Sequence, residues 1–566
     1  MATKTVREKK VMAFWIFISL AALLFLIKGV LAVELRNPEI ERMEDEFSAA
    51  PSEALADYVY LIIVDGLRVD GMDSMPYLSE LAAQGGYGIM TVPEPTFSRP
   101  AYARIITGAS SSITGINSNI QARRLTIPTI YDIIADQGVK TGASAYKWFY
   151  EIAVGTPYRT GKGCENRTVK DITLPIQFGY YYDDNDNYTY DDQEIFAEGR
   201  KIMEEHSPNF LIVHSMEVDM AGHNYGGTSP EFSERSREND LYIRDFVEAI
   251  PHPEKSIVIV VGDHGHIDRG GHGGPEKEAV EVPLVIWGRN VQAGTADGYN
   301  QFDIAPTIAA ILGVPFSSYM EGRVMDEPFN WAQGAVTQHN NTLGELHRPF
   351  VASLYDRFDI PYSGGAEEIS IAGLHEIMND KVVHSQLVFT IIILAIMLII
   401  IFLWFGLYRW NNVRNMFRGR GRALASAFAA TIVYFIVYQL TLRLLSLDYS
   451  YSIVDINLKF VAMITLPALI AFIFFYLLFV RWMKEQAGFE NFSLHTAVLI
   501  IALLVVIIVA AINQGGNEVF LPDLKWFIIY AFSTYHLLIT GLCCIIFSRF
   551  TKKVAFDLDT KARQAL

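Results

Sequence analysis

Hydrophobic residues in the middle of the chain form short runs with helical stretches between them. The runs are rich in β-branched residues and lie at 58–66, 209–217, 256–265 and 282–288. Strands that are hydrophobic on both faces belong to a sheet covered by helices, so we expect an α/β domain with a largely parallel sheet flanked by helices. Because ligands of such sheets bind beyond the carboxyl ends of the strands, the polar residues that follow each run are the first place to look for chemistry.

Much longer apolar segments lie at both ends of the chain. Residues 11–33 are long enough to cross a bilayer. A basic start and small residues after the run leave a cleaved signal peptide as the alternative. Five further spans are expected at about 387–408, 423–441, 460–480, 494–513 and 526–547. His536 falls in the last span, where it either lines a polar cavity or bonds to a neighbouring helix.

Basic residues indicate the orientation of these spans. With the N-terminus in the cytoplasm, both chain ends and the basic loops lie inside, whereas the two short outer loops hold only Arg443, Lys459 and Lys525. The basic residues on the inner side would be Lys4, Arg7, Lys9, Lys10, Arg409, Arg414, Arg418, Arg420, Arg422, Arg481, Lys484 and the tail from Arg549. The sequence therefore predicts a multi-pass membrane protein with cytoplasmic termini and an outward-facing middle segment, at the cell exterior or in the ER lumen.

This topology divides the chain into four parts. They are an N-terminal membrane anchor at 1–33, an extracytoplasmic catalytic domain at 34–385, a five-helix transmembrane domain at 386–548 and a basic cytoplasmic tail at 549–566. The middle part carries 26 Lys and Arg against 53 Asp and Glu, a net charge of −27, and the rest of the chain carries +11. An acidic domain beside a bilayer argues against nucleic acid as a partner and favours a membrane lipid.

Acidic and imidazole side chains follow the predicted strands. Glycines beside several of them permit a close approach of the backbone. Carboxylate oxygens and imidazole nitrogens in such a set are the ligands expected of two Zn²⁺ or Mn²⁺ ions. His214 is better explained as a hydrogen-bonded core histidine within its strand, and His266 as a neighbour of the site. The six residues of the predicted ligand set are Asp65, Asp219, His223, Asp263, His264 and His272.

A nucleophile is available in the segment 94–108. Pro100 and Gly108 fit the start and the end of a helix, which places Ser98 at or near the N-cap. A helix N-terminus favours a phosphoryl group, and a metal ion lowers the pKa of a coordinated hydroxyl. Without the neighbouring ligand set, Ser98 would be explained as a simple helix cap.

Several motifs between residues 58 and 325 resemble the alkaline phosphatase superfamily. The similarity is to nucleotide pyrophosphatase/phosphodiesterases and, more closely, to GPI ethanolamine phosphate transferases. The residues that carry it are Asp65-Gly-Leu-Arg, Pro95-Thr-Phe-Ser-Arg-Pro, Asp219 to His223, Gly262-Asp-His-Gly, Asp303-Ile-Ala-Pro-Thr and Leu312-Gly-Val-Pro. Ser98 lacks the Cys-or-Ser-x-Pro-Ser-Arg sequence that a sulfatase would require.

The resemblance implies a role for each matching residue. When the family motif is aligned with this sequence, Ser98 occupies the position of the nucleophile. Thr96, on the same turn, is the alternative. The resemblance assigns Asn119, with Asn117 in reserve, to a phosphate oxygen. One metal ion would be bound by Asp65, Ser98, Asp263 and His264, and the other by Asp219, His223 and His272. The metals would be two divalent ions, Zn²⁺ or alternatively Mn²⁺.

These observations predict a two-metal phosphotransferase that forms a covalent phosphoseryl intermediate. Its substrate would be a phospholipid or lipid-linked phosphodiester, and it would transfer an ethanolamine-phosphate-like head group to a lipid-linked acceptor. The alternatives are an extracytoplasmic phosphodiesterase or pyrophosphatase-type hydrolase and an inactive membrane scaffold. Five C-terminal spans are fewer than the eukaryotic transferases have, so the acceptor and any protein partners stay open.

Overall fold

The structure is a computed structural model of the chain. It describes residues 45–50, 53–155, 167–170, 175–183, 189–357, 361, 373–374, 421–445, 452, 457–483, 489–513 and 524–564. The predicted spans at 11–33 and 387–408 lie outside the described residues. The division of the chain at residues 33, 385 and 548 therefore stays a prediction.

The described strands of the middle part form one mixed, mostly parallel sheet. Its order is β4-β5-β3-β6-β1-β7-β8-β2-β9, and the pairs from β5 to β7 are all parallel. The pairs β4·β5, β7·β8 and β2·β8 are antiparallel. The strand bounds are β1 Tyr58–Val64, β2 Gly86–Thr91, β3 Thr141–Tyr146, β4 Arg167–Lys170, β5 Phe178–Tyr182, β6 Phe210–Ser215, β7 Ser256–Gly262, β8 Glu281–Gly288 and β9 Gly294–Thr295. The predicted fold class is confirmed, and the four predicted runs correspond to β1, β6, β7 and β8.

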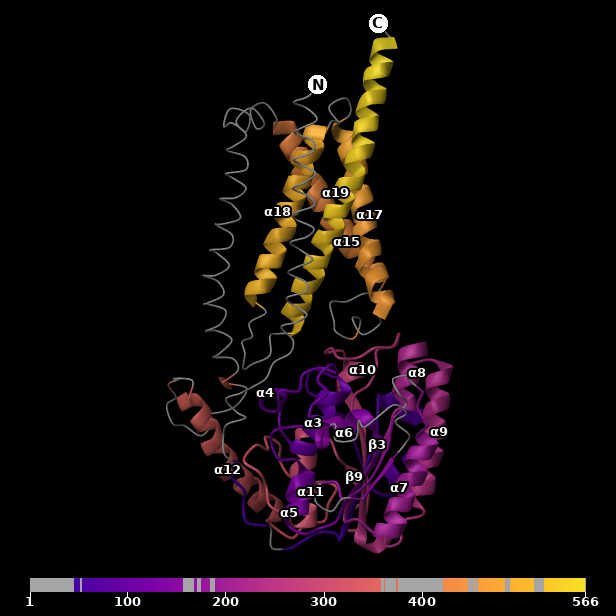
Figure 1. The fold of residues 1–566 in the computed structure, drawn as a ribbon, viewed down its shortest axis with the longest axis vertical. Coiled ribbons are helices and arrows are strands. Elements are labelled where there is room, and N and C mark those ends of the chain that lie inside the picture. Colours follow the sequence, from indigo (N-terminus) through magenta and orange to yellow (C-terminus); the bar gives the residue numbers. More distant parts are fainter. Residues whose placement is uncertain are drawn as a thin grey trace.

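Helices cover both faces of this sheet (Figure 1). Along β1, Leu61 and Ile63 belong to one buried apolar cluster, whereas Tyr60 and Ile62 belong to another. The first cluster includes residues of α3 Ser98–Thr107, α5 Ile130–Asp136, α6 Lys147–Ala153 and α11 Ile304–Leu312. The second includes residues of α2 Pro76–Gln84, α7 Asp192–His206, α8 Glu217–Tyr225 and α9 Pro230–Val247. Alternation along β1 thus buries the strand on both sides, as a central strand requires.

Shorter helices connect these layers, and one longer helix lies outside them. The shorter helices are η2 Val69–Ser74, α4 Ser111–Thr114, η3 Pro253–Lys255, α10 Lys277–Val280 and η4 Gln301–Asp303. The longer helix is α12 Ala335–Arg357. Figure 1 shows α10 at the end of the domain that is nearest to the C-terminal helices.

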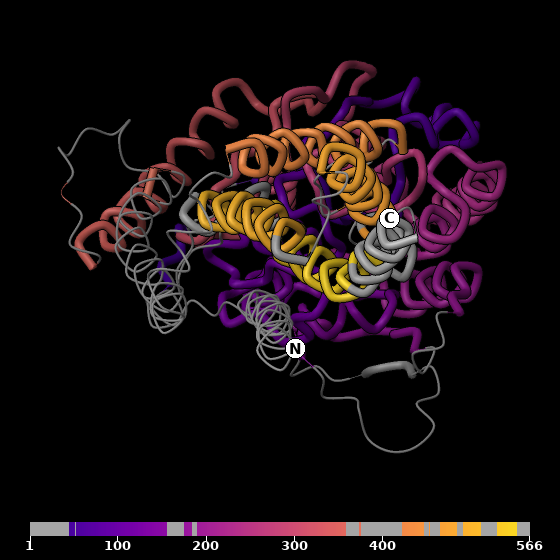
Figure 2. Tube along the Cα trace, turned by 90° about the horizontal axis from the view of Figure 1, so that it is seen from above, coloured from indigo at the N-terminus to yellow at the C-terminus, as the bar shows by residue number. Residues whose placement is uncertain are grey.

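Four long C-terminal helices stand together beyond the sheet domain (Figures 1 and 2). They are α15 Gly421–Leu444, α17 Asn457–Met483, α18 Phe489–Asn513 and α19 Leu524–Gln564. Each contains a stretch long and apolar enough to cross a membrane: Gly421–Leu444, Thr465–Met483, Asn491–Ala510 and Ile529–Ser548. These agree with four of the predicted spans.

The α15 helix shows how these helices pack. Phe428, Ile432, Ile436 and Leu440 recur every four residues and are all exposed, whereas small residues such as Ala427 face inward. Large apolar side chains outside and small residues inside are typical of helices that associate in lipid. His536 of α19 is buried, hydrogen-bonds to Tyr434 Oη and stacks on Tyr438 at 4.1 Å. Of the two interpretations of His536, the structure therefore supports a bond to a neighbouring helix.

Candidate metal centre and nucleophile

The candidate site lies at the carboxyl ends of three neighbouring strands. Val64 of β1 pairs with Ser215 of β6 and with Gly262 of β7, so these strands end at the same level. Asp65 and Asp263 therefore follow side by side, and α8 begins two residues beyond Ser215. Gly66 has a φ of +72°, and a Cβ there would lie 2.7 Å from the Asp219 Cα. Only glycine lets the turn after β1 approach α8 this closely.

Four side chains converge on one point, and we call them the Ser98 cluster: Asp65, Ser98, Asp263 and His264. The His264 Nε2 atom lies 3.2 Å from Ser98 Oγ, 3.3 Å from Asp65 Oδ1 and 3.4 Å from Asp263 Oδ2. All four residues are buried. The structure thus brings together the residues that the resemblance assigns to the first metal ion.

Neighbouring groups hold the two carboxylates so that one oxygen of each faces this point. His214 Nε2 lies 3.1 Å from Asp65 Oδ2, and Tyr102 Oη donates to the same oxygen. Backbone N–H groups of Gly66 and His264 donate to Asp263 Oδ1. Asp65 Oδ1 and Asp263 Oδ2 are left buried with no hydrogen-bond donor among the described residues. Buried carboxylate oxygens of this kind fit a divalent cation, which would satisfy both.

The electrostatics of the cluster support the same interpretation. Burial raises the pKa of Asp263 well above its ordinary value, and the nearby Asp65 raises it further. Burial, followed by the charge of Asp219, also raises the pKa of Asp65. Burial lowers the pKa of His264 well below its ordinary value. Crowded acids beside neutral imidazoles are stabilised in their ligand forms by a bound cation, which offsets the repulsion.

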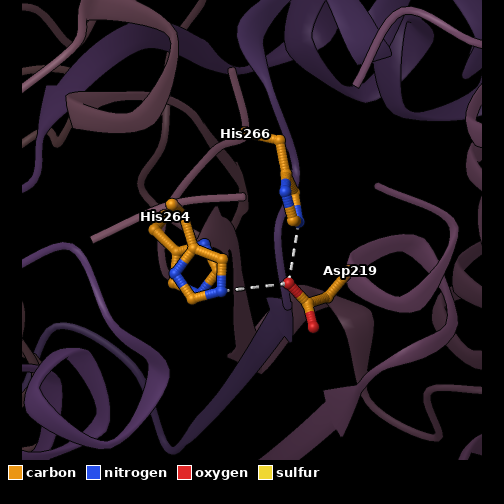
Figure 3. A group of neighbouring side chains, drawn as sticks. Asp219, His264 and His266 are labelled. Carbon is orange, nitrogen blue, oxygen red and sulfur yellow. Dashed lines mark hydrogen bonds and ion pairs between the residues drawn. The ribbon is translucent and has the colours of Figure 1, made fainter. Parts of the chain in front are cut away.

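A second group, the Asp219 cluster, adjoins the first and consists of Asp219, His223, His266 and His272. His266 Nε2 lies 2.8 Å from Asp219 Oδ1, and His272 Nε2 lies 3.7 Å from the same oxygen. His223 Nε2 lies 3.4 Å from Asp219 Oδ2 and 3.1 Å from His272 Nε2. Figure 3 shows His266 and His264 on two sides of Asp219. The rings of His264 and His272 stack at 3.7 Å between centroids, so the two clusters are in direct contact.

The hydrogen bond at Nδ1 distinguishes the histidines that can offer an Nε2 lone pair to a metal ion from those that cannot. His264 Nδ1 donates to Gly265 O at 3.2 Å, and His272 Nδ1 donates to Thr96 O at 2.8 Å. In their neutral forms, both rings therefore point an Nε2 lone pair at the site, the arrangement of metal-binding histidines.

His266 shows the opposite arrangement. The Gly271 N–H donates to His266 Nδ1 at 3.0 Å, so the neutral ring carries its proton on Nε2 and donates it to Asp219. In this tautomer the His266 Nε2 proton faces Asp219, so the ring offers no lone pair to the site and holds the Asp219 carboxylate in place. His214 holds Asp65 in a similar way, through Nε2. Both histidines thus contact the carboxylate of a candidate ligand.

The structure separates the two candidate nucleophiles. Helix α3 begins at Ser98 and ends before Gly108, which has a φ of +70°. Ser98 therefore lies at the first turn, with its Oγ against His264. Thr96 Oγ1 accepts from the Gly273 N–H at 2.8 Å and donates to Gly274 O at 3.0 Å. Both functions of the Thr96 hydroxyl are thus occupied, which favours Ser98.

Asn119 lies over the first turn of α3. Its Oδ1 accepts from the backbone N–H of Arg99 at 3.0 Å, directly after Ser98. Arg99 donates in turn to Asn119 O and to Glu151. These contacts fix the Asn119 amide beside the nucleophile, where its NH₂ group is a suitable donor to a phosphate oxygen. The Asn117 backbone N–H instead donates to Gln121 Oε1 at 2.5 Å.

Several supporting residues were not predicted from the sequence. Arg104 is almost fully buried, donates to Pro95 O at 3.1 Å and donates to Gln301 Oε1 at 3.0 Å. Gln301 donates to Asp263 O, which ties the nucleophile turn to the ligand loop. Tyr102 and Arg104 follow Ser98 on the same helix. The sequence signal that could have identified them is a tyrosine and an arginine within the otherwise apolar residues 100–106.

Parts of the chain are similar to known proteins. Residues 59–271 match the family model of type I phosphodiesterase / nucleotide pyrophosphatase. The chain is 27% identical over 175 residues to the catalytic subunit of mouse GPI ethanolamine phosphate transferase 3, which covers 30% of this chain and 16% of that protein. It is 24% identical over 339 residues to mouse GPI ethanolamine phosphate transferase 1, covering 51% of this chain and 34% of that protein. The matched regions thus span only 16% and 34% of the lengths of these relatives.

A solved alkaline phosphatase superfamily protein from Vibrio parahaemolyticus is also similar, with a TM-score of 0.35 and 16% identity over 55% of this chain and 80% of that one. The matches to the phosphodiesterase / nucleotide pyrophosphatase model and to the GPI ethanolamine phosphate transferases confirm that part of the predicted resemblance. Residues 59–271 are thus similar to type I phosphodiesterases / nucleotide pyrophosphatases, and about half of the chain is similar to part of a GPI ethanolamine phosphate transferase.

Proposed function

We propose that this protein is a membrane-anchored, two-metal phosphotransferase that acts on lipid-linked phosphodiesters through a phosphoserine at Ser98. The observation that supports the proposal best is the approach of Ser98 Oγ to His264 Nε2 at 3.2 Å, beside the buried carboxylates of Asp65 and Asp263. An inactive scaffold would gain nothing from burying three aspartates against one another, because each buried charge is costly.

The ligand groups are distributed over two neighbouring positions. We propose that the Ser98 cluster holds one divalent cation and that Asp219, His223 and His272 hold the other, with Zn²⁺ preferred for its nitrogen and oxygen ligands. Such ions would lower the pKa of the Ser98 hydroxyl and neutralise charge on the phosphoryl oxygens. His214, Tyr102 and His266 orient the carboxylates that bind them.

In the first step, Ser98 Oγ attacks phosphorus. The bond from phosphorus to the leaving alcohol breaks, and the serine proton ends on that alcohol. The Asn119 NH₂ group donates to a phosphoryl oxygen, and the N-terminal turn of α3 favours the negative charge there. An acceptor hydroxyl then bonds to phosphorus as the bond to Oγ breaks, and Ser98 regains a proton.

The nature of the acceptor decides between transfer and hydrolysis. Four described helices are long and apolar enough to cross a membrane, and they stand beside the end of the domain that carries α10. A lipid donor or acceptor held in the bilayer would enter from that side. This arrangement and the relation to GPI ethanolamine phosphate transferases support transfer of an ethanolamine-phosphate-like group. The match to the phosphodiesterase / nucleotide pyrophosphatase model favours hydrolysis as the second candidate.

Hydrolysis of bis-p-nitrophenyl phosphate by the full chain tests the chemistry. We expect activity with Zn²⁺ or Mn²⁺, loss of activity on chelation, and a phosphoprotein that disappears in Ser98→Ala. Activity that survives Ser98→Ala and disappears in Thr96→Ala would assign the nucleophile to Thr96. A purified protein without metal would favour the scaffold.

Transfer is tested with phosphatidylethanolamine that carries a radiolabelled head group. We expect the label to move to a glycolipid acceptor in the same vesicles. Release of labelled ethanolamine phosphate alone, at the same rate with and without the glycolipid, would support the hydrolase.

A further inference from the structure

The loop that carries the site histidines also contacts the C-terminal helices. It runs from His264 to Glu276, between β7 and α10. Ile267 in this loop packs against the buried apolar cluster formed by those helices. Ser452, which lies between α15 and α17 in the sequence, contacts the other end of the loop. The site and the membrane-spanning part are therefore in direct contact.

Ser452 makes two hydrogen bonds to this loop. Its Oγ accepts from the Gly274 N–H at 3.0 Å and donates to Glu276 Oε2 at 2.7 Å. The side chain is fully buried. A buried hydroxyl that accepts and donates at once is fixed in one orientation, and its removal leaves an amide and a carboxylate without these partners.

Thr96 holds the same loop from the opposite side. Its hydroxyl bonds to Gly273 N and Gly274 O, and its carbonyl accepts from His272 Nδ1. Gly273 has a φ of +110°, and a Cβ there would lie 2.3 Å from the Phe97 ring. Residues 272–274 are therefore held between the nucleophile turn and Ser452, and their position determines where His272 Nε2 lies.

We propose that Ser452 is a positioning residue through which the membrane-spanning part fixes His272 in the Asp219 cluster. The inference rests on the proposed function where metal affinity or activity is the readout, whereas hydrogen exchange is independent of it. It predicts that the metal affinity of the outer domain depends on a hydroxyl contributed from between two membrane helices. It also predicts that Ser452 acts without touching the substrate.

The full chain in detergent tests this role with Ser452→Ala, the conservative Ser452→Thr and the matched control Ser548→Ala. Ser548 is equally buried in α19 and donates to Ile545 O of its own helix. We expect Ser452→Ala to lower the affinity for one Zn²⁺ ion about fivefold to tenfold, measured by competition with a chelator. Hydrogen exchange of the peptide covering 270–276 should accelerate in the metal-free protein. For bis-p-nitrophenyl phosphate, kcat at limiting metal should fall with KM unchanged.

Ser452→Thr should restore all three measurements, and Ser548→Ala should leave them unchanged. Wild-type exchange and wild-type zinc affinity in a folded Ser452→Ala protein would overturn the proposal. If that variant does not fold, Glu276→Gln replaces it, because this change removes only the charge of the group that accepts from Ser452. It should accelerate hydrogen exchange of the same peptide. Unchanged exchange in Glu276→Gln would also overturn the proposal. A wild-type protein without phosphodiesterase activity would refute the proposed function, while the exchange result would still decide the role of Ser452.

Discussion

The buried histidines of the C-terminal helices and the buried carboxylates of the site differ in their hydrogen bonds. In the helices, His536 bonds to Tyr434, and His495 bonds to Ser426 Oγ at 2.9 Å and to Asn491 O at 2.7 Å. At the carboxyl ends of the strands, Asp65 Oδ1 and Asp263 Oδ2 are buried without a hydrogen-bond donor among the described residues. Buried polar groups that are satisfied stabilise a structure, whereas groups left open toward a common point indicate a ligand.

The two regions also differ in what their exposed surfaces contain. Large apolar side chains such as Ile432 and Leu440 are exposed on α15. The sheet domain instead buries its apolar residues in two clusters, one on each face. The sheet domain thus buries apolar side chains as a domain in water does, whereas the exposed apolar side chains of α15 suit a lipid environment.

The largest expected effect comes from the nucleophile. Ser98→Ala should reduce kcat at least about a thousandfold, because no other hydroxyl lies against His264 among the described residues. Metal content and melting temperature should stay close to wild type, since only one oxygen is removed. Thr96→Ser, which keeps the hydroxyl bonds to Gly273 and Gly274, serves as the control and should retain most of the activity.

Replacing a candidate ligand carboxylate should weaken metal binding but raise the melting temperature of the metal-free protein. Asp263→Asn should lower the affinity for one ion more than about 100-fold. In metal-free protein the same change should raise the melting temperature by about 2 to 4 °C, because it removes repulsion between buried acids. Calorimetry with and without a chelator measures both. A metal-free variant less stable than the wild type would contradict the idea that these oxygens are open to a cation.

A supporting histidine should have a smaller effect than a ligand. His266→Asn should weaken metal binding about tenfold, because it removes the hydrogen bond that orients Asp219. His272→Asn, which removes a proposed ligand, is the comparison and should weaken binding more. Equal losses in zinc titrations of the two variants would show that His266 itself binds a metal.

The smallest effect is expected in the helices. His536→Phe should lower the free energy of unfolding by about 1 kcal/mol, the contribution of a hydrogen bond between membrane helices. Zinc content and activity should not change. Tyr434→Phe should have a similar effect, and the double variant should cost less than the sum of the two, as measured by unfolding in denaturing detergent. Loss of activity in His536→Phe would instead give this histidine a role in substrate handling.

The hydrophobic pattern was sufficient for the central strands and for four membrane helices. It was insufficient for β3, whose residues Thr141–Tyr146 are small and polar yet completely buried. β3 is buried because β5 and β6 pair with it on either side and helices cover both faces of the sheet. The antiparallel pairing of β8 with β7 and β2 was likewise not visible in the apolar run at 282–288.

The sequence by itself determined which residue types follow the strands, and therefore most of the candidate ligand set. Those residues directly follow apolar runs whose strand character is visible locally. Only the tertiary structure decided which oxygen or nitrogen of each side chain faces the site. That choice depends on partners far away in the chain, such as Thr96 for His272 and Tyr102 for Asp65. Hydrogen bonds between distant segments form only once the sheet brings the strand ends to one level, so no local pattern specifies them.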